Sequence, residues 1–186
     1  MGPMYGFQWR RYGANYDGKT GRAEDGSLCF DQLSKVINEI KTDPNSRRIL
    51  LTDFNPEQAD QGVLYPCHSI IIQFYVEDEY LDMFCYNRSS DLFLGLPFNI
   101  ASSSLFLSII AKITKKIPRC LHISLGDCHI YESHIQSVKT QLERFVHRLP
   151  KLIIKREIDD IDDLKLEDFE LEDYVSEQTI KAEMIA

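Results

Sequence analysis

The spacing of apolar residues along the chain predicts three helices. Apolar side chains recur on one helix face over residues 28–40, and the Asp-Pro-Asn sequence at 43–45 is typical of a helix end. A buried helix is expected over Pro97–Lys115, with the proline in its first turn. An amphipathic helix is expected over Ile130–Phe145. Each apolar stripe indicates a face that packs against another part of the domain.

Runs of β-branched and aromatic residues predict six strands. These strands are expected at Arg48–Asp53, Ser69–Val76, Leu81–Asn87, Leu121–Leu125, Leu152–Ile154 and Thr179–Met184. A turn at Glu77–Tyr80 joins the second strand to the third, and the glycine-rich residues 12–27 are expected to form a loop. The order of elements favours an α+β fold, a sheet with helices packed on it, over a repeating βαβ pattern.

Composition agrees with one packed domain over residues 1–186. Hydrophobic residues make up 44% of the chain and aromatic residues 11%, which is enough for a core. The formal net charge is −8, and this argues against a general binder of nucleic acids or membrane surfaces. Residues 157–173 hold ten acidic residues and one lysine, a pattern typical of a solvated face. The remainder carries +1, so a basic pocket for an anion remains possible elsewhere.

The cysteines and the apolar runs suggest a compartment and exclude some classes of site. Five cysteines with no CxxC pair indicate free thiols in a reducing, cytoplasmic setting. Cys120, His122, Cys128 and His129 lie close in sequence but lack the spacing of a zinc site, so no metal is expected. The apolar stretch Leu105–Ile113 is interrupted by polar residues, and we expect no membrane span.

Cys67 is the first residue that could carry out chemistry. A lone cysteine is more often a small core residue than a nucleophile. Pro66 fixes the chain directly before the thiol. A reactive thiolate needs a nearby cation, and His68 would point to the opposite face of a strand. An arginine from a neighbouring strand is therefore the better candidate to activate Cys67.

Three further segments could bind an anion or a polar ligand. Arg88–Asp91 combines an arginine with two serines, which suits a phosphate cradle but also a polar turn with an Arg88–Asp91 pair. The arginine pair Arg47–Arg48 lies between a predicted helix and a strand, where it could instead cap the helix. Gly126–Tyr131 places His129 and Tyr131 after a predicted strand, where either a site or a capping role is possible.

Nine stretches of the sequence, in order, resemble the thymidylate synthase family. They are Gly2–Arg10, Ser46–Ile49, Phe54–Pro56, Pro66–His68, Gln73–Val76, Arg88–Asp91, Leu94–Ser102, Gly126–Tyr131 and Thr179–Lys181. The resemblance covers essentially the whole chain. It implies a thymidylate synthase-like sheet with packed helices. It also implies that the N-terminal part of the fold is missing, as in the C-terminal portion of a synthase or of a bifunctional dihydrofolate reductase-thymidylate synthase.

The resemblance implies methylation of dUMP to dTMP. In this family 5,10-methylenetetrahydrofolate gives both the carbon and the hydride. A thiolate that adds to uracil C6 turns C5 into a nucleophile. Cys67 matches the nucleophile, Arg88 the arginine that contacts both phosphate and thiolate, and Tyr5 a tyrosine of the network that removes the C5 proton. These three residues are the expected catalytic set.

Other positions match binding residues of the family. The expected dUMP contacts are Arg47, Arg48, Arg88, Ser89, Ser90, Asp91, Asn99, His129 and Tyr131. Within this set, Asn99 reads the uracil edge, and the arginine pair reaches the phosphate of the partner subunit in a homodimer. The expected folate contacts are Asp91, Leu94, Gly95, Phe98 and Ile185. No metal, membrane or nucleic acid is required.

The chain also departs from the family pattern. It lacks the N-terminal segment that supplies a catalytic glutamate, a phosphate arginine and a folate-stacking tryptophan, so the isolated chain is expected to have little or no activity. Asn87 stands where glutamine is usual, and Phe54 where tryptophan is usual. The segment after Cys67 is one residue longer, which reverses the strand faces unless a bulge absorbs it. Two alternatives remain open: a non-catalytic homologue that binds nucleotide or pairs with a full-length subunit, and a pyrimidine hydroxymethylase.

Overall fold

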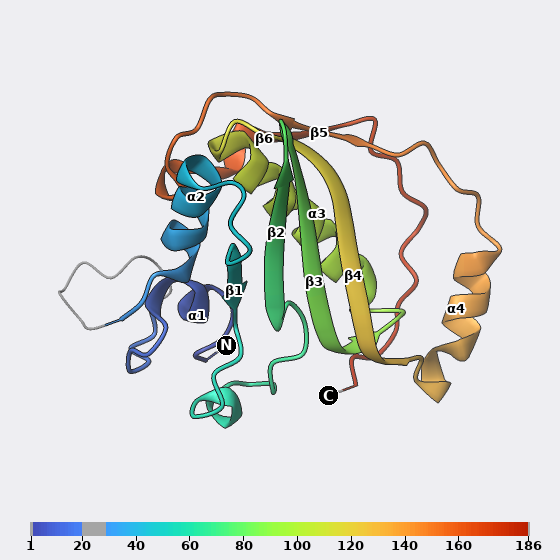
Figure 1. The fold of residues 1–186 in the computed structure, drawn as a ribbon. Coiled ribbons are helices and arrows are strands. Elements are labelled where there is room, and N and C mark those ends of the chain that lie inside the picture. Colours follow the sequence, from blue (N-terminus) through green and yellow to red (C-terminus); the bar gives the residue numbers. More distant parts are fainter. Residues whose placement is uncertain (1, 20–28, 186) are drawn as a thin grey trace.

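A mixed four-stranded sheet forms the centre of the molecule (Figure 1). The structure, a computed structural model, describes residues 2–19 and 29–185. The strands lie in the order β1 (Leu50–Thr52), β2 (Ile71–Glu77), β3 (Tyr80–Asp91) and β4 (Ile117–His129). The first three pair antiparallel, whereas β4 runs parallel to β3. This mixture of sheet and helices agrees with the predicted α+β class.

One long helix connects the two parallel strands and covers one face of the sheet (Figure 1). This helix, α3 (Leu96–Ile113), has proline in its first turn, as predicted. Its buried residues Leu107 and Ile110 join a core with Ile72 and Phe74, which point inward from β2. A helix is needed here because parallel strands require a crossover connection. The fold therefore contains a single β-α-β unit within an otherwise antiparallel arrangement.

The same helix is long and apolar enough to cross a membrane, and it is the one helix of this kind within residues 2–19 and 29–185. The sequence analysis judged only the apolar stretch Leu105–Ile113, whereas the whole helix Leu96–Ile113 has the length and composition of a span. Its inward residues, among them Ile113 and Ala111, pack against the sheet. Packing on the sheet thus accounts for the apolar residues on one side of the helix, while Phe98 and Ile100 remain exposed.

The N-terminal residues form a short helix, α1 (Gly6–Arg11), that the sequence pattern did not predict. Six residues are too few to show a helical period. Phe7 is fully buried, and Trp9 stacks on Phe106 at a centroid distance of 5.0 Å. The side chain of Gln32 donates to the carbonyls of Gln8 and Thr52, which ties this helix to β1. The N-terminal aromatic residues are thus part of the core.

The predicted helix over 28–40 is α2 (Gln32–Thr42). Asp31 begins it, with a side-chain oxygen that accepts a hydrogen bond from the backbone N–H of Ser34 at 2.9 Å. Leu28 and residues 20–27 of the predicted loop lie outside the described residues. The predicted amphipathic helix is shorter than expected, a 3₁₀ turn at Glu132–His134 followed by α4 (Ile135–Leu142).

The closing strands are β5 (Lys151–Ile154) and β6 (Phe169–Glu172), which pair antiparallel. The prediction that Thr179–Met184 forms the second closing strand was wrong. That segment carries no strand, and the carbonyl of Glu183 instead accepts a hydrogen bond from His134 Nε2 at 2.8 Å. Acidic residues on both sides of Phe169 obscured the alternation of apolar and polar residues in β6, so the sequence pattern did not predict this strand.

The acidic segment 157–173 is largely solvated, as predicted, because eight of its ten acidic residues are exposed, but parts of it are anchored to the domain. Ile158 belongs to the core, and Asp162 receives two hydrogen bonds from the guanidinium of Arg10 at 2.8 and 2.9 Å. Asp168 is buried and accepts from Arg156 Nε at 2.6 Å, which lowers the pKa of this carboxyl. Two 3₁₀ turns, Ile161–Asp163 and Leu166–Asp168, precede β6. The segment therefore anchors the closing strands to the first helix.

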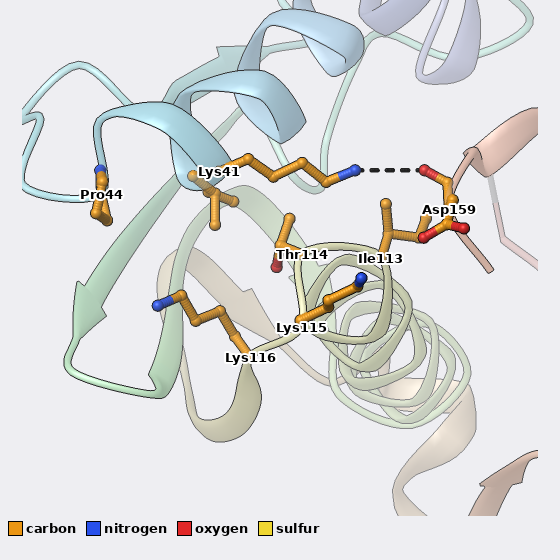
Figure 2. A pocket seen from close by; sticks show the side chains of 8 residues that line it. Lys41, Pro44, Ile113, Thr114, Lys115, Lys116 and Asp159 are labelled. Carbon is orange, nitrogen blue, oxygen red and sulfur yellow. Dashed lines mark hydrogen bonds between the residues drawn. The ribbon is translucent and has the colours of Figure 1, made fainter. Parts of the chain in front are cut away.

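A cavity of about 400 Å³ lies where the C-terminal ends of α2 and α3 meet (Figure 2). Lys41 Nζ donates to the backbone carbonyl of Asp159 at 3.3 Å across this cavity, and Lys116 Nζ donates to the carbonyl of Asp78 at 2.8 Å. Cations are favourable near helix C-termini because the last carbonyls carry partial negative charge. These lysines thus tie the two helix ends to neighbouring segments, and the residues that line the cavity are not among those predicted for the site.

Candidate active site

Cys67 lies half-buried on the segment that enters β2, with Tyr5 as its polar neighbour. Tyr5 Oη is 3.8 Å from Cys67 Sγ. The Tyr5 ring stacks on the ring of His68 at 4.2 Å and 11°. Burial and the neighbouring Cys67 raise the pKa of Tyr5 above its usual value. Tyr5 therefore stays protonated beside the thiol at any physiological pH.

The backbone of Tyr5 is held in an unusual conformation. Its φ is +48°, a left-handed value that costs energy for a residue with a Cβ. The residue lies directly before α1, so the start of this helix and the stack on His68 fix the hydroxyl relative to the thiol. The short N-terminal helix thereby positions a candidate catalytic group.

Arg88 reaches the Cys67 segment from β3, as predicted for a neighbouring strand. Its Nε donates to the carbonyl of Pro66 at 3.0 Å. Its guanidinium carbon lies 5.2 Å from the centroid of the Tyr65 ring. The positive charge is thus fixed next to the residue that precedes the thiol.

The parallel pairing of β3 with β4 brings the next predicted residues together. Ser89, Ser90 and Asp91 face Asp127, Cys128 and His129 in the register. Ser90 is buried, and its hydroxyl has no hydrogen-bond partner among the described residues. Asp91 Oδ1 accepts from the backbone N–H groups of Phe93 and Leu94, so Asp91 shapes the turn into α3.

The remaining nucleotide candidates lie around this edge. Asn99 is half-buried in the first turns of α3, after Gly95 at the start of the helix. His129 donates to Asp127 at 3.1 Å and meets the Tyr131 ring edge-on at 5.0 Å. Tyr131 in turn contacts the ring of His134 at 5.6 Å.

The predicted folate contacts form a separate, open group. Leu94 and Gly95 lie at the turn into α3, and Phe98 is 75% exposed. The hydrogen bond from His134 to Glu183 brings the C-terminal tail with Ile185 to this side. An apolar cavity of about 270 Å³ beside Tyr5 does not include these residues. It is lined by Tyr5, Trp9, His68, Ser69, Ile72, Ser102, Ser103, Leu105, Phe106 and Ile109.

Arg47 and Arg48 are not brought to the Cys67 site. The carbonyl of Ile49 accepts from Phe74 N–H at 2.8 Å, so the arginines lie near the level of Phe74 on β2. Cys67 lies before β2 begins at Ile71, so roughly 10 Å of regular strand from Ile71 to Phe74, and the irregular segment Cys67–Ile70, separate it from the level of the arginines. Both arginines are exposed. Within one chain they do not serve the same site as Cys67.

Sequence reasoning missed two residues that shape the site. Asp53 was assigned only to a strand end, yet it is 1% exposed and neither carboxylate oxygen has a hydrogen-bond partner among the described residues. Burial raises its pKa to about 7. An acidic residue directly after three apolar or small strand residues was the available signal. Gly126 is the second residue, because a Cβ there would lie 2.7 Å from the carbonyl oxygen of Arg88.

Gly126→Ala is expected to destabilise the fold by about 1–3 kcal/mol and to displace Arg88. The added methyl group would meet Arg88 O and Tyr86 Oη, both at 2.7 Å. Urea denaturation measures the loss. Ser124→Ala on the same strand, where the side chain is exposed, is the control. Equal stability of Gly126→Ala and the parent would show that β4 does not need its close approach to Arg88.

A mixed sheet with a crossover helix, and a cysteine beside a tyrosine on a segment that an arginine binds, define a candidate nucleophilic enzyme. Across residues 2–19 and 29–185, no group of three or more His, Cys, Asp or Glu side chains could hold a metal ion. The family model for thymidylate synthase matches residues 1–186. The chain belongs to the thymidylate synthase family, whose characterised members are methyltransferases.

Relatives match nearly all of this chain but extend well beyond it. Over 184 residues it is 46% identical to the thymidylate synthase of Homo sapiens, covering 99% of this chain and 58% of the relative. Identity is 45% over 193 residues with thymidylate synthase from Saccharomyces cerevisiae, with 99% and 62% covered. It is 44% over 186 residues with the bifunctional dihydrofolate reductase-thymidylate synthase of Leishmania major, with 99% and 35% covered. The chain therefore spans less than two thirds of each.

Proposed function

We propose that this chain provides the site for methylation of dUMP to dTMP, with 5,10-methylenetetrahydrofolate as donor of the carbon and the hydride. The observation that carries the proposal is the 3.8 Å approach of Tyr5 Oη to Cys67 Sγ beside the bound guanidinium of Arg88. A thiol beside a proton-holding group, on a segment that a cation binds, is an arrangement that favours nucleophilic addition.

In this proposal each residue near the thiol has one task. Cys67 loses its proton and its sulfur bonds to uracil C6, so the ring electrons move to O4 and C5 becomes nucleophilic. C5 then bonds to the one-carbon unit and loses its proton, and the bond from that carbon to the folate breaks to leave a methylene group on C5. The hydride from the folate adds to this methylene carbon, which becomes the methyl group, and the sulfur leaves C6. Tyr5, whose raised pKa keeps it neutral, orders the groups that accept the C5 proton. Dihydrofolate is the second product.

Binding is assigned along the edge formed by β3, β4 and the start of α3. Ser90, buried with an unpartnered hydroxyl, and Ser89 would donate to the phosphate together with Arg88. His129 and Tyr131 would contact the ribose, and Asn99 the uracil edge. The folate would rest on the residues around the turn into α3 and on the C-terminal tail. These residues are Asp91, Leu94, Gly95, Phe98 and Ile185.

We further propose a homodimer formed through the exposed face of the sheet. No helix in the described part of the chain covers this face (Figure 1). It presents Ile71, Tyr75, Phe84 and Tyr86, and the ring of His122 stacks on Phe84 at 4.3 Å. A contiguous aromatic surface of this kind favours burial against another protein. Dimerisation would let Arg47 and Arg48 reach the phosphate in the partner subunit.

Tritium release from dUMP labelled at C5 tests the function. The assay is run on the chain completed with the part of the human relative that the match does not cover, and on the 186 residues alone. Release that requires both 5,10-methylenetetrahydrofolate and Cys67 is expected from the completed chain, and little from the short one. A completed chain that binds dUMP without releasing tritium would favour the non-catalytic alternative.

Asn99→Asp separates the synthase from the pyrimidine hydroxymethylase alternative. Uracil offers N3–H and O4 to an amide, whereas cytosine offers N3 and an amino group. A carboxylate would repel O4 and accept from the cytosine amino group. The variant is therefore expected to lose dUMP turnover and gain reaction with dCMP, a change in preference of roughly two to three powers of ten.

Competition kinetics with both nucleotides measures this preference in the completed chain. Ser104→Ala, further along α3 and exposed, is the control and should keep the parent's preference. If Asn99→Asp still prefers dUMP as strongly as the parent, Asn99 does not read the base.

A further inference from the structure

The extra residue after Cys67 is absorbed by a β-bulge. Ile71 faces Tyr86 in the register of β2 with β3, yet the N–H of Ile70 also donates to the carbonyl of Tyr86, at 2.9 Å. Two residues of one strand thus oppose one residue of the other, which defines a bulge. Beyond it, Cys67 O accepts from Ser89 N–H at 3.3 Å, so the pairing has shifted by one residue.

Ser69 is the turning point of this bulge. Its φ is +54°, a left-handed conformation, and the residue is 6% exposed. A bulge leaves one backbone N–H without a ladder partner, and a buried N–H without any partner is costly. The N–H of Ser69 is in this position, facing away from the regular ladder.

The side chain of Asn87 replaces the missing ladder bond. Asn87 Oδ1 accepts from Ser69 N–H at 2.9 Å, and both residues are buried. Asn87 is 1% exposed, and its Nδ2 has no partner among the described residues. The hydrogen bond that Oδ1 accepts is therefore the polar contact that the structure gives to this side chain. Asn87 is also the neighbour of Arg88, which holds the carbonyl of Pro66.

We infer that Asn87 is a positioning residue for Cys67, and that asparagine at 87 and the bulge at Ser69–Ile71 are a matched pair. Four consecutive residues of β3, Tyr86 to Ser89, each contribute one hydrogen bond to the segment from Pro66 to Ile70. The shorter amide reaches the bulge N–H, whereas a glutamine would extend one methylene too far. The asparagine at 87 and the longer segment after Cys67, both departures from the family pattern, therefore act together to position the Cys67 thiol.

Alkylation of Cys67 tests this inference without any nucleotide, so a failure of the proposed function leaves the test intact. Iodoacetamide modification is followed by mass spectrometry of the separate cysteine peptides, with the exposed Cys120 as internal reference. Asn87→Leu, similar in size but without an acceptor, should loosen the segment. The Cys67 rate relative to Cys120 is expected to rise at least threefold.

A double-mutant cycle tests the pairing of the two positions. Asn87→Gln and deletion of Ser69 should each raise the relative Cys67 rate at least threefold, and the combined variant should return to within twofold of the parent. In the completed chain, Asn87→Leu should lower kcat at least tenfold with KM for dUMP within threefold, because it misplaces the thiol rather than a binding group.

Two results would overturn the inference. One is a combined variant in which the fold-change of the relative Cys67 rate equals the product of the fold-changes in the two single variants. Independent positions give this product because they do not compensate for each other. The other, which decides alone if the deletion variants fail to fold, is an unchanged Cys67-to-Cys120 ratio in Asn87→Leu.

Discussion

Asp53→Asn is expected to gain about 3 kcal/mol of unfolding free energy relative to the parent when the pH is raised from 5 to 8. Burial raises the pKa of Asp53 to about 7 in the folded chain, from an ordinary 3.8. A carboxyl with a raised folded pKa stabilises the fold while it is protonated. That contribution is lost between about pH 4 and pH 7 as the buried group ionises. Asparagine is similar in shape and carries no charge at either pH.

Urea denaturation of both chains at pH 5 and pH 8 measures this difference. Burial lowers the pKa of His68, which also makes stability depend on pH, but this contribution is common to both chains and cancels in the comparison. Asp60→Asn, at an exposed position, is the control and should show the same difference from the parent at both pH values. An Asp53→Asn difference that is constant with pH would show that Asp53 does not ionise in the folded chain over this range.

Mixing two inactive variants of the completed chain is expected to restore about a quarter of the sites. Cys67→Ala removes the nucleophile, and Arg47→Ala removes a phosphate contact that we assign to the partner subunit. Arg47 is exposed and lies near the level of Phe74, away from the end of β2 that follows Cys67, so we expect it to act in trans. Random exchange gives half heterodimers, each with one complete site.

Tritium release before and after subunit exchange measures the recovery. Mixing Cys67→Ala with Tyr5→Ala is the control, because both groups belong to the same subunit and each mixed dimer then has no complete site. The two pairs should therefore differ strongly. No recovery in the first pair would place the arginines in their own subunit or outside the site.

The parts of the fold that sequence predicted are those with strong periodic signals. The stripe from Leu33 to Ile40 and the proline at 97 fixed two helices close to their observed bounds. The helix α1 was not predictable because its burial depends on distant partners such as Phe106. Thr179–Met184 was misassigned because a strand needs a ladder partner, and the available edge of β5 is taken by β6.

The candidate site was predictable where the residues have distinctive chemistry. The pattern pointed to Cys67 and to an arginine from the neighbouring strand, and the structure brings Tyr5 and Arg88 to that segment. The role of Asn87 was not predictable, because it depends on a left-handed Ser69 and a one-residue shift in pairing. Asp53 was missed because burial, rather than residue type, gives it its raised pKa.

The most direct test of the central claim is to trap the nucleotide on the thiol. With 5-fluoro-dUMP the C5 position has no proton to lose, so an adduct at C6 accumulates once the one-carbon unit has been attached. The completed chain is incubated with this nucleotide and 5,10-methylenetetrahydrofolate and is mapped by peptide mass spectrometry. The proposed function requires an adduct on Cys67 that disappears in Cys67→Ser. An adduct on another cysteine, or none while the human relative forms one under the same conditions, would contradict it.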